Sequence, residues 1–291
     1  MQAIGNKVHT SLKILDKSFS KADSENYNLL IQLGLNGLSY AILDKKRNKF
    51  IALYKYDFQE LIEPNLINDY LKDVIDQDPN LKNKFRRVKC SYVTSKNTLV
   101  PAPLFDESKL SSYLKFNHHI DKEETARHDI IQGLDSMNVY TIHRDFGNML
   151  NKYFQNFQLF HYSTPLIEGV LSQNKNLTTK KLIVNVHPNQ FEVLLIEGKK
   201  LHLYNTFQYY SKEDFIYYVL FVCDELELNP ETIDLEIVGS LEKTSELYKI
   251  ATKYVRNIGF GNRIDSAEYC FEINDLPAHQ NYNLFNLNLC E

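Results

Sequence analysis

Three neighbouring segments near the start of the chain are rich in apolar residues, and polar turns separate them. These short apolar runs predict strands over residues 29–35, 38–44 and 49–57, because runs of this length bounded by turn residues are typical of buried strands. The pair Asn36-Gly37 is typical of a tight hairpin turn. Apolar residues at helical spacing follow over 60–75, so we expect a three-stranded meander and then a helix.

The same order of elements returns at a spacing of 153 residues, with Ile183 in the place of Leu30 (183 minus 30). Residues 183–204 again contain three strand-like segments, and a helical segment follows over 213–227. A solenoid needs a period of about 20–50 residues and several copies. A single repeat at this long spacing therefore predicts two similar halves.

The rest of the chain adds further strands and helices to each half. Predicted strands cover residues 9–15, 88–94, 98–101, 114–118, 137–142, 157–162 and 233–238, and predicted helices cover 106–113, 146–154, 166–172 and 242–256. Residues 123–131 are polar and favour no single state, and residues 269–291 are expected to form short strands and loops. Strands first and helices between later strands predict an α/β fold with sheets of mixed strand direction.

The length of 291 residues suits two domains of about 100–150 residues each. We expect an N-terminal extension over 1–27, a first lobe over 28–163 and a second lobe over 164–291. The helix of 166–172 is expected to cross between the two lobes.

Composition narrows the classes of function. A net charge of −4 gives no basic footprint for nucleic acid, and we expect no nucleic-acid partner. The chain contains no run of about 18 apolar residues, so we expect no membrane span. Four widely spaced cysteines without a Cys-x-x-Cys pair indicate buried free thiols in a reducing cytoplasm; they are Cys90, Cys223, Cys270 and Cys290.

Three short motifs stand at the ends of predicted strands. They are Gln32-Leu33-Gly34 followed by Asn36-Gly37, then Asn185-Val186-His187 followed by Pro188, and finally Val238-Gly239-Ser240. With these motifs, residues 28–260 resemble the actin-like ATPase superfamily of actin, heat-shock chaperones, sugar kinases and bacterial pilus-assembly and cell-division proteins. The whole chain resembles an uncharacterised bacterial family with this fold. The resemblance implies two similar actin-like (ribonuclease H-like) lobes, each with a mixed sheet and flanking helices.

The resemblance also implies where the chain departs from an active enzyme. In the superfamily each hairpin carries Asp-x-Gly, whose turn amides bind nucleotide phosphates and whose Asp orients a hydrated magnesium ion. Here Gln32 and Asn185 stand in place of the two acids. His187 puts a ring where the phosphate turn needs no side chain, and Pro188 removes a backbone donor. The Gly-Gly of the adenosine motif keeps one glycine, Gly239.

The missing acids argue against phosphoryl transfer, because that reaction depends on metal charge placed against the transferring group. Each factor of ten in rate corresponds to about 1.4 kcal/mol of transition-state stabilisation, so two lost carboxylates could remove several powers of ten. We therefore assign no catalytic residue and no metal ligand, and we expect no required cofactor.

A residual site remains as an expectation that rests on the resemblance. A bound nucleotide or other anion should lie between the two hairpins, where glycine- and asparagine-rich turns present backbone and amide donors. Because no carboxylate is expected there, ATP binding should be weak and independent of metal. The expected contact residues are Gly34, Asn36, Gly37, Asn185, His187 and Asn189, with Gly239 and Ser240 on the base side.

Two functions stay open at this point. The first is a protein-binding or scaffold module with an unknown protein partner and no ATPase activity. The second is a slow or unconventional ATP-dependent phosphotransferase or ATPase that uses Asp44 or Glu192 in place of the missing acids. We expect Asp44 and Glu197 to be solvated and His187 to face water. A second group of polar residues lacks the His-Glu-x-x-His pattern and is expected to form a solvated connection: His118, His119, Asp121, Glu123, Glu124, His128 and Asp129.

Overall fold

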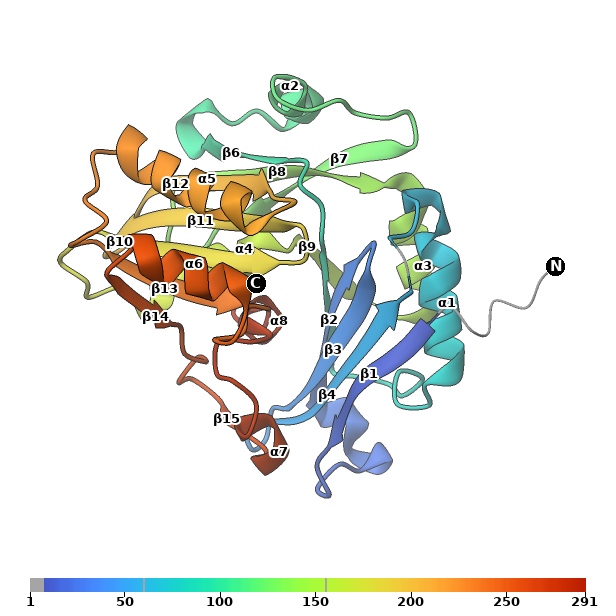
Figure 1. Ribbon diagram of the computed structural model, residues 1–291. Helices are drawn as coiled ribbons and strands as arrows, with labels where there is room; N and C mark the ends of the chain where they lie inside the picture. The colour runs from blue at the N-terminus through green and yellow to red at the C-terminus, as the bar shows by residue number, and fades with distance from the viewer. Residues whose placement is uncertain (1–7, 60, 155) are drawn as a thin grey trace. The chain divides into compact units, whose positions relative to one another are not determined.

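The computed structural model describes residues 8–59, 61–154 and 156–291, and the chain divides into two compact units (Figure 1). The first unit comprises Met1–Leu166, Asp265–Asp275 and Leu284–Glu291. The second unit comprises Ile167–Ile264 and Leu276–Asn283. Within the described residues, no helix combines the length and the apolar character needed to cross a membrane.

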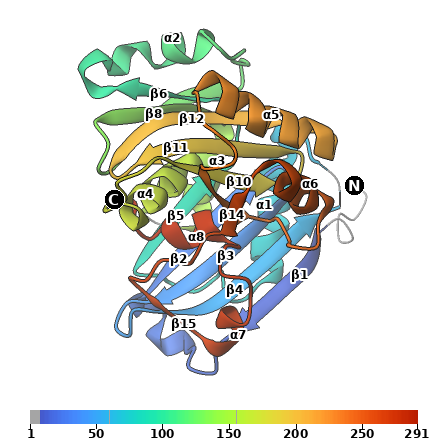
Figure 2. The same cartoon turned by 60° about the vertical axis from the view of Figure 1, so that its left-hand side comes forward.

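The first unit is built on a mixed sheet in the order β1-β4-β3-β2-β5-β9, with β15 added beside β4. Figure 2 shows β1, β4, β3 and β2 of this sheet side by side. The meander β2–β3–β4 and the strand β1 pair in antiparallel fashion, whereas β2, β5 and β9 are parallel. The strands are β1 (Val8–Leu15), β2 (Tyr27–Gly34), β3 (Gly37–Asp44), β4 (Lys49–Phe58), β5 (Arg87–Tyr92), β9 (Phe157–His161) and β15 (Glu268–Tyr269).

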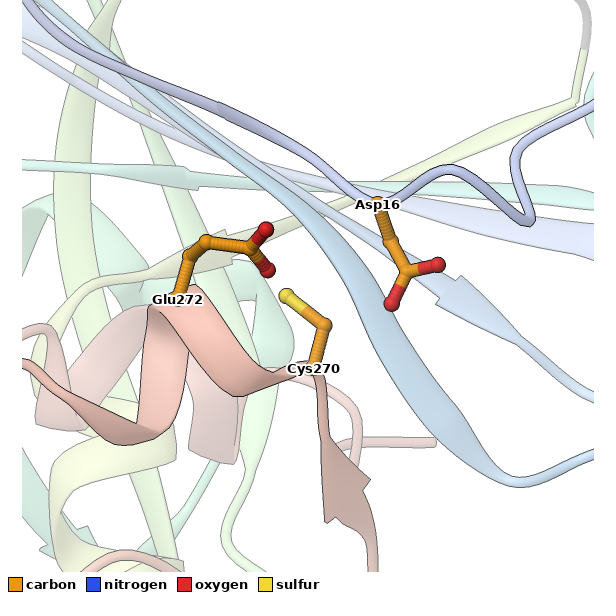
Figure 3. A group of neighbouring side chains, drawn as sticks. All are labelled: Asp16, Cys270 and Glu272. Carbon is orange, nitrogen blue, oxygen red and sulfur yellow. The ribbon is translucent and has the colours of Figure 1, made fainter.

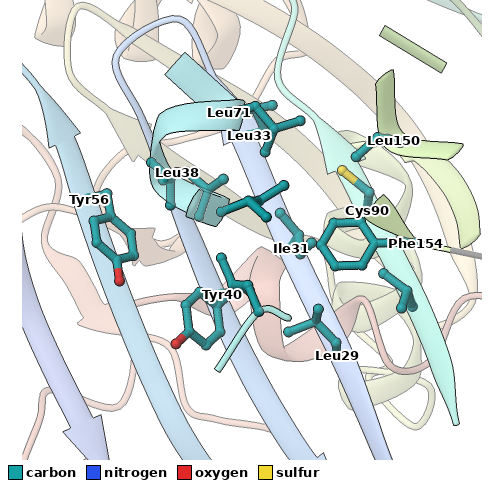
Figure 4. Packing of buried hydrophobic residues seen from close by; sticks show 14 of the residues in the cluster. Leu29, Ile31, Leu33, Leu38, Tyr40, Tyr56, Leu71, Cys90, Leu150 and Phe154 are labelled. Carbon is teal, nitrogen blue, oxygen red and sulfur yellow. The ribbon is translucent and has the colours of Figure 1, made fainter. Parts of the chain in front are cut away.

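Helices α1 (Ile67–Gln77) and α3 (Arg144–Tyr153) lie together on one side of this sheet (Figure 1). Alternation along β2 directs Leu29, Ile31 and Leu33 to that side, where they join buried residues of both helices in one core (Figure 4). The apolar stripe of each helix and the apolar face of the meander therefore cover one another.

A smaller three-stranded sheet in the first unit has the order β6-β8-β7, and helix α2 packs against it. Its elements are β6 (Asn97–Pro101), β7 (Glu124–Ile130), β8 (Ser136–His143) and α2 (Leu110–Lys115). The strand predicted for 114–118 is wrong, because Leu114 ends the apolar side of α2 and packs against Val100 and Val139. The polar segment 123–131 forms β7, which pairs with β8 along its whole length.

The second unit contains a five-stranded sheet in the order β12-β11-β10-β13-β14. Helices α5 and α6 contact each other and contribute Phe215, Val219 and Ala251 to the core beneath them. The elements are β10 (Lys181–His187), β11 (Gln190–Glu197), β12 (Lys200–Gln208), β13 (Asp234–Gly239), β14 (Asn257–Phe260), α5 (Lys212–Glu225) and α6 (Glu246–Tyr254).

The division into units differs from the predicted ranges at both ends of the chain. Strand β1 belongs to the first sheet through its pairing with β4, rather than to an extension over 1–27. Helix α4 (Ser163–Gln173) begins in the first unit and continues in the second, where the helix over 166–172 was expected to cross. The C-terminal part returns twice to the first unit, as β15 with α7 (Phe271–Asn274) and again after residue 283 within α8 (Tyr282–Asn286).

The two meanders have the same register. Gln32 lies opposite Ser39 in the first, and Asn185 lies opposite Glu192 in the second, so both members of the pair are displaced by 153 residues (185 minus 32; 192 minus 39). The second and third strands of each meander also have a register shift at the equivalent place. In β3 it falls between Ile42 and Leu43, and in β11 it falls between Leu195 and Ile196. Two mixed sheets with equivalent meanders and flanking helices confirm the predicted fold class.

A buried carboxylate fixes the end of α1 against the first meander. The hydroxyls of Tyr40 and Tyr56 donate to Oδ2 of Asp78 at 2.7 and 2.6 Å, and the amide of Asn80 donates to its Oδ1 at 2.9 Å. Burial, together with the Asp78 carboxylate, raises the pKa of both tyrosines. Both hydroxyls therefore stay protonated and remain donors.

Replacing Asp78 by Ala is expected to lower the free energy of unfolding by about 2–4 kcal/mol, because two buried hydroxyls lose their acceptor. Urea denaturation measures the change. Asp78→Asn keeps an acceptor oxygen and should lose less, and Asp76→Ala, at an exposed position of α1, should change little. An Asp78→Ala protein as stable as the wild type would show that the hydroxyls find water instead.

Candidate functional site

The first hairpin ends in a two-residue turn, Leu35-Asn36, flanked by the paired glycines Gly34 and Gly37. The turn therefore lies one residue earlier than Asn36-Gly37. A Cβ on Gly37 would lie 2.5 Å from the carbonyl oxygen of Tyr56, so this glycine is required for the close approach of β4. The carbonyl of Asn36 accepts from the Phe58 amide at 3.0 Å, and that of Leu35 accepts from the Ile62 amide at 2.9 Å.

Gln32 takes the position of the expected acid in this hairpin. It lies on β2 opposite Ser39, two residues before Gly34. Its Oε1 is buried and has no hydrogen-bond partner among the described residues. A neutral amide at this place can donate or accept a hydrogen bond, but it cannot supply the charge that holds magnesium's hydration shell.

The second hairpin holds a polar cluster at the equivalent place. Nδ2 of Asn185 donates to Oε2 of Glu192 at 2.7 Å and lies 2.9 Å from Nε2 of His187. Nε2 of His187 is 3.4 Å from the same carboxylate oxygen. Asn185 and Glu192 are fully buried.

This cluster corrects two expectations. The first was that the hairpin has no carboxylate, whereas Glu192 lies beside Asn185 on the neighbouring strand. Its signal in the sequence is the register: a turn at Pro188-Asn189 pairs residue 185 with residue 192. The second was that His187 faces water. Its side chain is only 15% exposed, because the ring turns back toward Asn185 and Glu192.

The third motif lies beside the same hairpin. Strand β13 runs parallel to β10 with Gly239 opposite Val186, and the Ser240 amide donates to the Val186 carbonyl at 2.8 Å. Gly239 has a φ of +93°, and a Cβ there would lie 2.4 Å from that carbonyl and 2.7 Å from Oδ1 of Asn185. Only glycine fits at this place, because both the conformation and the space exclude a side chain.

The predicted site residues thus form two groups. Gly34, Asn36 and Gly37 share the first hairpin, and Asn185, His187, Asn189, Gly239 and Ser240 gather at one end of the second unit's sheet. Asn189 has a φ of +65°, which an asparagine in a turn tolerates, and its carbonyl accepts from the Tyr209 amide. An anion held jointly by the two groups stays a prediction.

Comparison with known proteins assigns the chain to a family. The family model described as "Protein of unknown function (DUF3822)" matches residues 16–258, which include both hairpins and the Gly239 motif. The chain belongs to this family. A comparison with curated proteins gives no match.

Two solved structures show the fold to which the family belongs. A Bacteroides thetaiotaomicron protein with an actin-like ATPase fold and unknown function is 23% identical, with a TM-score of 0.80, over 94% of this chain and 99% of that one. The PilM–PilN type IV pilus biogenesis complex contains a chain that is 11% identical, with a TM-score of 0.56, over 90% of this chain and 97% of that one. The fold is therefore actin-like, as the motifs predict.

The other acids considered at the sequence level have structural partners. Asp44 is only 5% exposed, so the expectation that it is solvated is wrong; its Oδ1 accepts from the amides of Lys46 and Arg47 and shapes the β3–β4 turn. Glu197 lies 3.1 Å from His202 at the corresponding turn of the second unit. Both carboxylates therefore have partners at the turns that join the second and third strands of the two meanders.

The described residues contain one group of side chains with the spacing of metal ligands: Asp16, Cys270 and Glu272, whose ligand atoms lie within 4.8 Å of one another (Figure 3). Asp16 accepts from the Ser18 amide at 2.8 Å and from Nζ of Lys49 at 3.0 Å, and these bonds lower its pKa to about 2. Burial raises the pKa of the Cys270 thiol. A compensated carboxylate and a protonated thiol do not favour a cation. The Cys270 amide donates to the Phe50 carbonyl at 2.9 Å, which places the group beside β4.

Sequence reasoning missed a buried polar network in the first unit. Asp129, expected in a solvated connection, is buried; its Oδ2 accepts from the His161 amide and the Thr164 hydroxyl at 2.7 Å each. The Ser163 hydroxyl lies 2.6 Å from Nδ1 of His161, and Nδ2 of Asn138 donates to it at 2.9 Å. These residues come from β7, β8, β9 and the start of α4.

The network resembles a nucleophile–base pair but is closed to substrate. Nε2 of His161 donates to the Thr94 carbonyl at 2.8 Å, which leaves Nδ1 to accept from Ser163. Ser163 and His161 are both fully buried. Burial lowers the pKa of His161 to about 3, so the ring stays neutral and fixes the start of α4.

Proposed function

We propose that this protein is a degenerate actin-like protein without ATPase activity, which acts as a protein-binding or scaffold module. The observation that carries the proposal is the pair of amides, Gln32 and Asn185, at matched positions of the two hairpins. Magnesium bound to nucleotide needs charged oxygen ligands or an acid that orients its waters. Neither amide supplies that charge.

The contacts of Asn185 support the same conclusion. Its Nδ2 is already engaged by Glu192 and His187 inside the sheet, and its Oδ1 is buried against Gly239. Turning this amide toward a ligand would break a hydrogen bond to a buried carboxylate, which costs about 1.5–3 kcal/mol. The side chain therefore favours holding the hairpin over holding a metal ion.

One observation favours a second candidate, a slow or unconventional ATP-dependent phosphotransferase or ATPase. Glu192 places a buried carboxylate 2.7 Å from Asn185, close to where the superfamily has its acid. If the contacts of Asn185 and His187 with the Glu192 carboxylate break, Glu192 becomes the acid of the second hairpin. The expectation of metal-independent ATP binding then fails, since Glu192 would both repel phosphate and attract magnesium.

The proposed partner is a protein, and the proposed location is the cytoplasm. One structural relative is a chain of the PilM–PilN type IV pilus biogenesis complex, and we extend protein binding to this chain as part of the proposal. The cysteines Cys90, Cys223, Cys270 and Cys290 are free and buried, which suits a reducing compartment. Partner capture from a native extract, with the bound proteins identified by mass spectrometry, tests this part.

Nucleotide chemistry tests the activity directly. We expect magnesium-dependent ATP turnover at background level, and calorimetry should give weak or no heat of ATP binding, equal with and without magnesium. Glu192→Gln keeps the acceptor for Asn185 and is the matched control. Turnover above background that Glu192→Gln or Gly34→Val abolishes would refute the scaffold proposal and establish the second candidate.

A further inference from the structure

The outward face of α5 carries a continuous stripe of acidic and aromatic side chains that the proposed function does not yet explain. Glu213, Tyr217, Phe221 and Asp224 follow one another at intervals of four, four and three residues, which places them on one side of the helix. All four are exposed. The opposite side of α5 supplies its buried residues to the core of the second unit: Phe215, Ile216, Val219, Val222 and Cys223.

The two aromatic residues are held in place rather than scattered on the surface. Tyr217 is 61% exposed and Phe221 is 43% exposed, yet their rings stack with centroids 6.3 Å apart and planes 19° apart. Tyr217 also contacts Tyr218 edge-on at 5.3 Å, and Tyr218 stacks on Phe207 at 4.9 Å. Single exposed aromatics are ordinary, but a fixed pair that extends from partly buried rings is a feature of recognition surfaces.

Carboxylates flank the aromatic pair at both ends. Glu213 lies one turn before Tyr217, and Asp224 and Glu225 lie one turn after Phe221; all three are exposed. Across the described residues, none of these three carboxylates has a hydrogen bond or ion pair. The single lysine of α5, Lys212, lies 3.2 Å from Glu246 of α6. The stripe and the adjacent Glu225 therefore present two rings and three uncompensated negative charges.

We infer that this face of α5 binds a basic, amphipathic segment of a partner protein. Lysine or arginine side chains can pair with Glu213, Asp224 and Glu225, and their cationic groups can also lie over the rings of Tyr217 and Phe221. Apolar residues of the same segment can pack on the ring faces, as in helix-in-groove recognition. The inference rests on the proposed protein-binding function and names the chemistry of its partner. The complementary charge argues for this occupant, because an acidic segment would be repelled.

The test uses the full chain and a defined probe. A synthetic helical peptide of about 18 residues carries leucine on one face and lysine and arginine on the other, and a second peptide has glutamate at every basic position. Fluorescence anisotropy measures binding of each. The test variants are Tyr217→Ala/Phe221→Ala and Glu213→Gln/Asp224→Asn/Glu225→Gln. Tyr254→Ala on α6 removes another exposed aromatic and is the matched control.

We expect the basic peptide to bind the wild type, with affinity that falls as salt is added, and the acidic peptide not to bind. Each test variant should weaken binding at least tenfold, and Tyr254→Ala should leave it within twofold. All substituted positions are exposed, so thermal melting should be unchanged. Equal binding by the wild type and the Tyr217/Phe221 variant overturns the inference.

Self-association offers a second way to overturn it. A wild-type oligomer in sedimentation that the Tyr217/Phe221 variant loses would make a second copy of this chain the occupant. The peptide experiment is independent of the nucleotide experiment. If the peptide does not bind and ATP turnover stays at background level, only the proposed binding surface on α5 is refuted. If ATP is turned over and the peptide still binds, only the proposal that the protein lacks ATPase activity is refuted.

Discussion

Replacing Asn185 by Asp is expected to lower the free energy of unfolding by about 3–5 kcal/mol at neutral pH, the cost of leaving a buried charge uncompensated. Although the change restores the superfamily's acid, the new carboxylate would lie about 2.7 Å from Oε2 of Glu192, where the amide now donates. Two buried carboxylates at this distance cannot both ionise freely. Urea denaturation with circular dichroism measures the loss.

The partner residue provides the control for this prediction. Glu192→Gln removes the repelling charge, so Asn185→Asp in that background should recover most of the lost stability. Magnesium gives a further distinction. If a cation binds between the two carboxylates, adding magnesium should restabilise Asn185→Asp alone. Undiminished stability of Asn185→Asp in the absence of any metal would mean that Glu192 is not the partner of this position.

Stability is expected to fall steeply as the pH is lowered from about 7 toward 3, with His161 as a main cause. Burial lowers the pKa of His161 in the folded state to about 3, against an ordinary histidine pKa of 6.5. Between these values the unfolded chain binds a proton that the folded chain does not. His161 therefore contributes stability above pH 6.5 that is lost as the pH falls, up to about 5 kcal/mol over the interval.

His161→Gln isolates this contribution, because the amide can still donate toward the Thr94 carbonyl and cannot titrate. The variant should be less stable at pH 7 but should show a shallower dependence on pH between 6.5 and 4.5, by about 1.4 kcal/mol per pH unit. Burial also lowers the pKa of His279, and this residue contributes the same pH dependence of stability in both proteins. If the free energy of unfolding changed with pH by the same amount in both proteins, His161 would be protonated in the folded state.

The proposed loss of ATPase activity and the proposed docking surface rest on different parts of the molecule. The nucleotide experiments concern the two hairpins, where Glu192 is the group to replace. The stripe on α5 lies within the second unit alone, and its peptide experiment requires no nucleotide. The two proposals can therefore be tested separately.

The sequence by itself determined the meanders, because their signals are local. Apolar runs over 29–35 and 38–44 and a polar turn between them fix a hairpin within about twenty residues, and the second meander repeats the signals. Turn length fixes register, so the pairing of Asn185 with Glu192 was implicit in the position of Pro188-Asn189. The resemblance to the actin-like superfamily, rather than a local signal, marked Gln32 and Asn185 as the replaced acids.

Only the tertiary structure decided which distant segments share a core. The burial of Asp129 beside His161 joins residues 32 positions apart, and the return of residues 265–275 to β4 joins residues more than 200 apart. No local period encodes such contacts, because polarity alone does not distinguish a solvated carboxylate from one held by buried donors. Asp44 and Asp129 were expected to be solvated, and both are buried in the fold, as is Glu192. Their hydrogen-bond partners, which offset the cost of burial, come from other strands and turns.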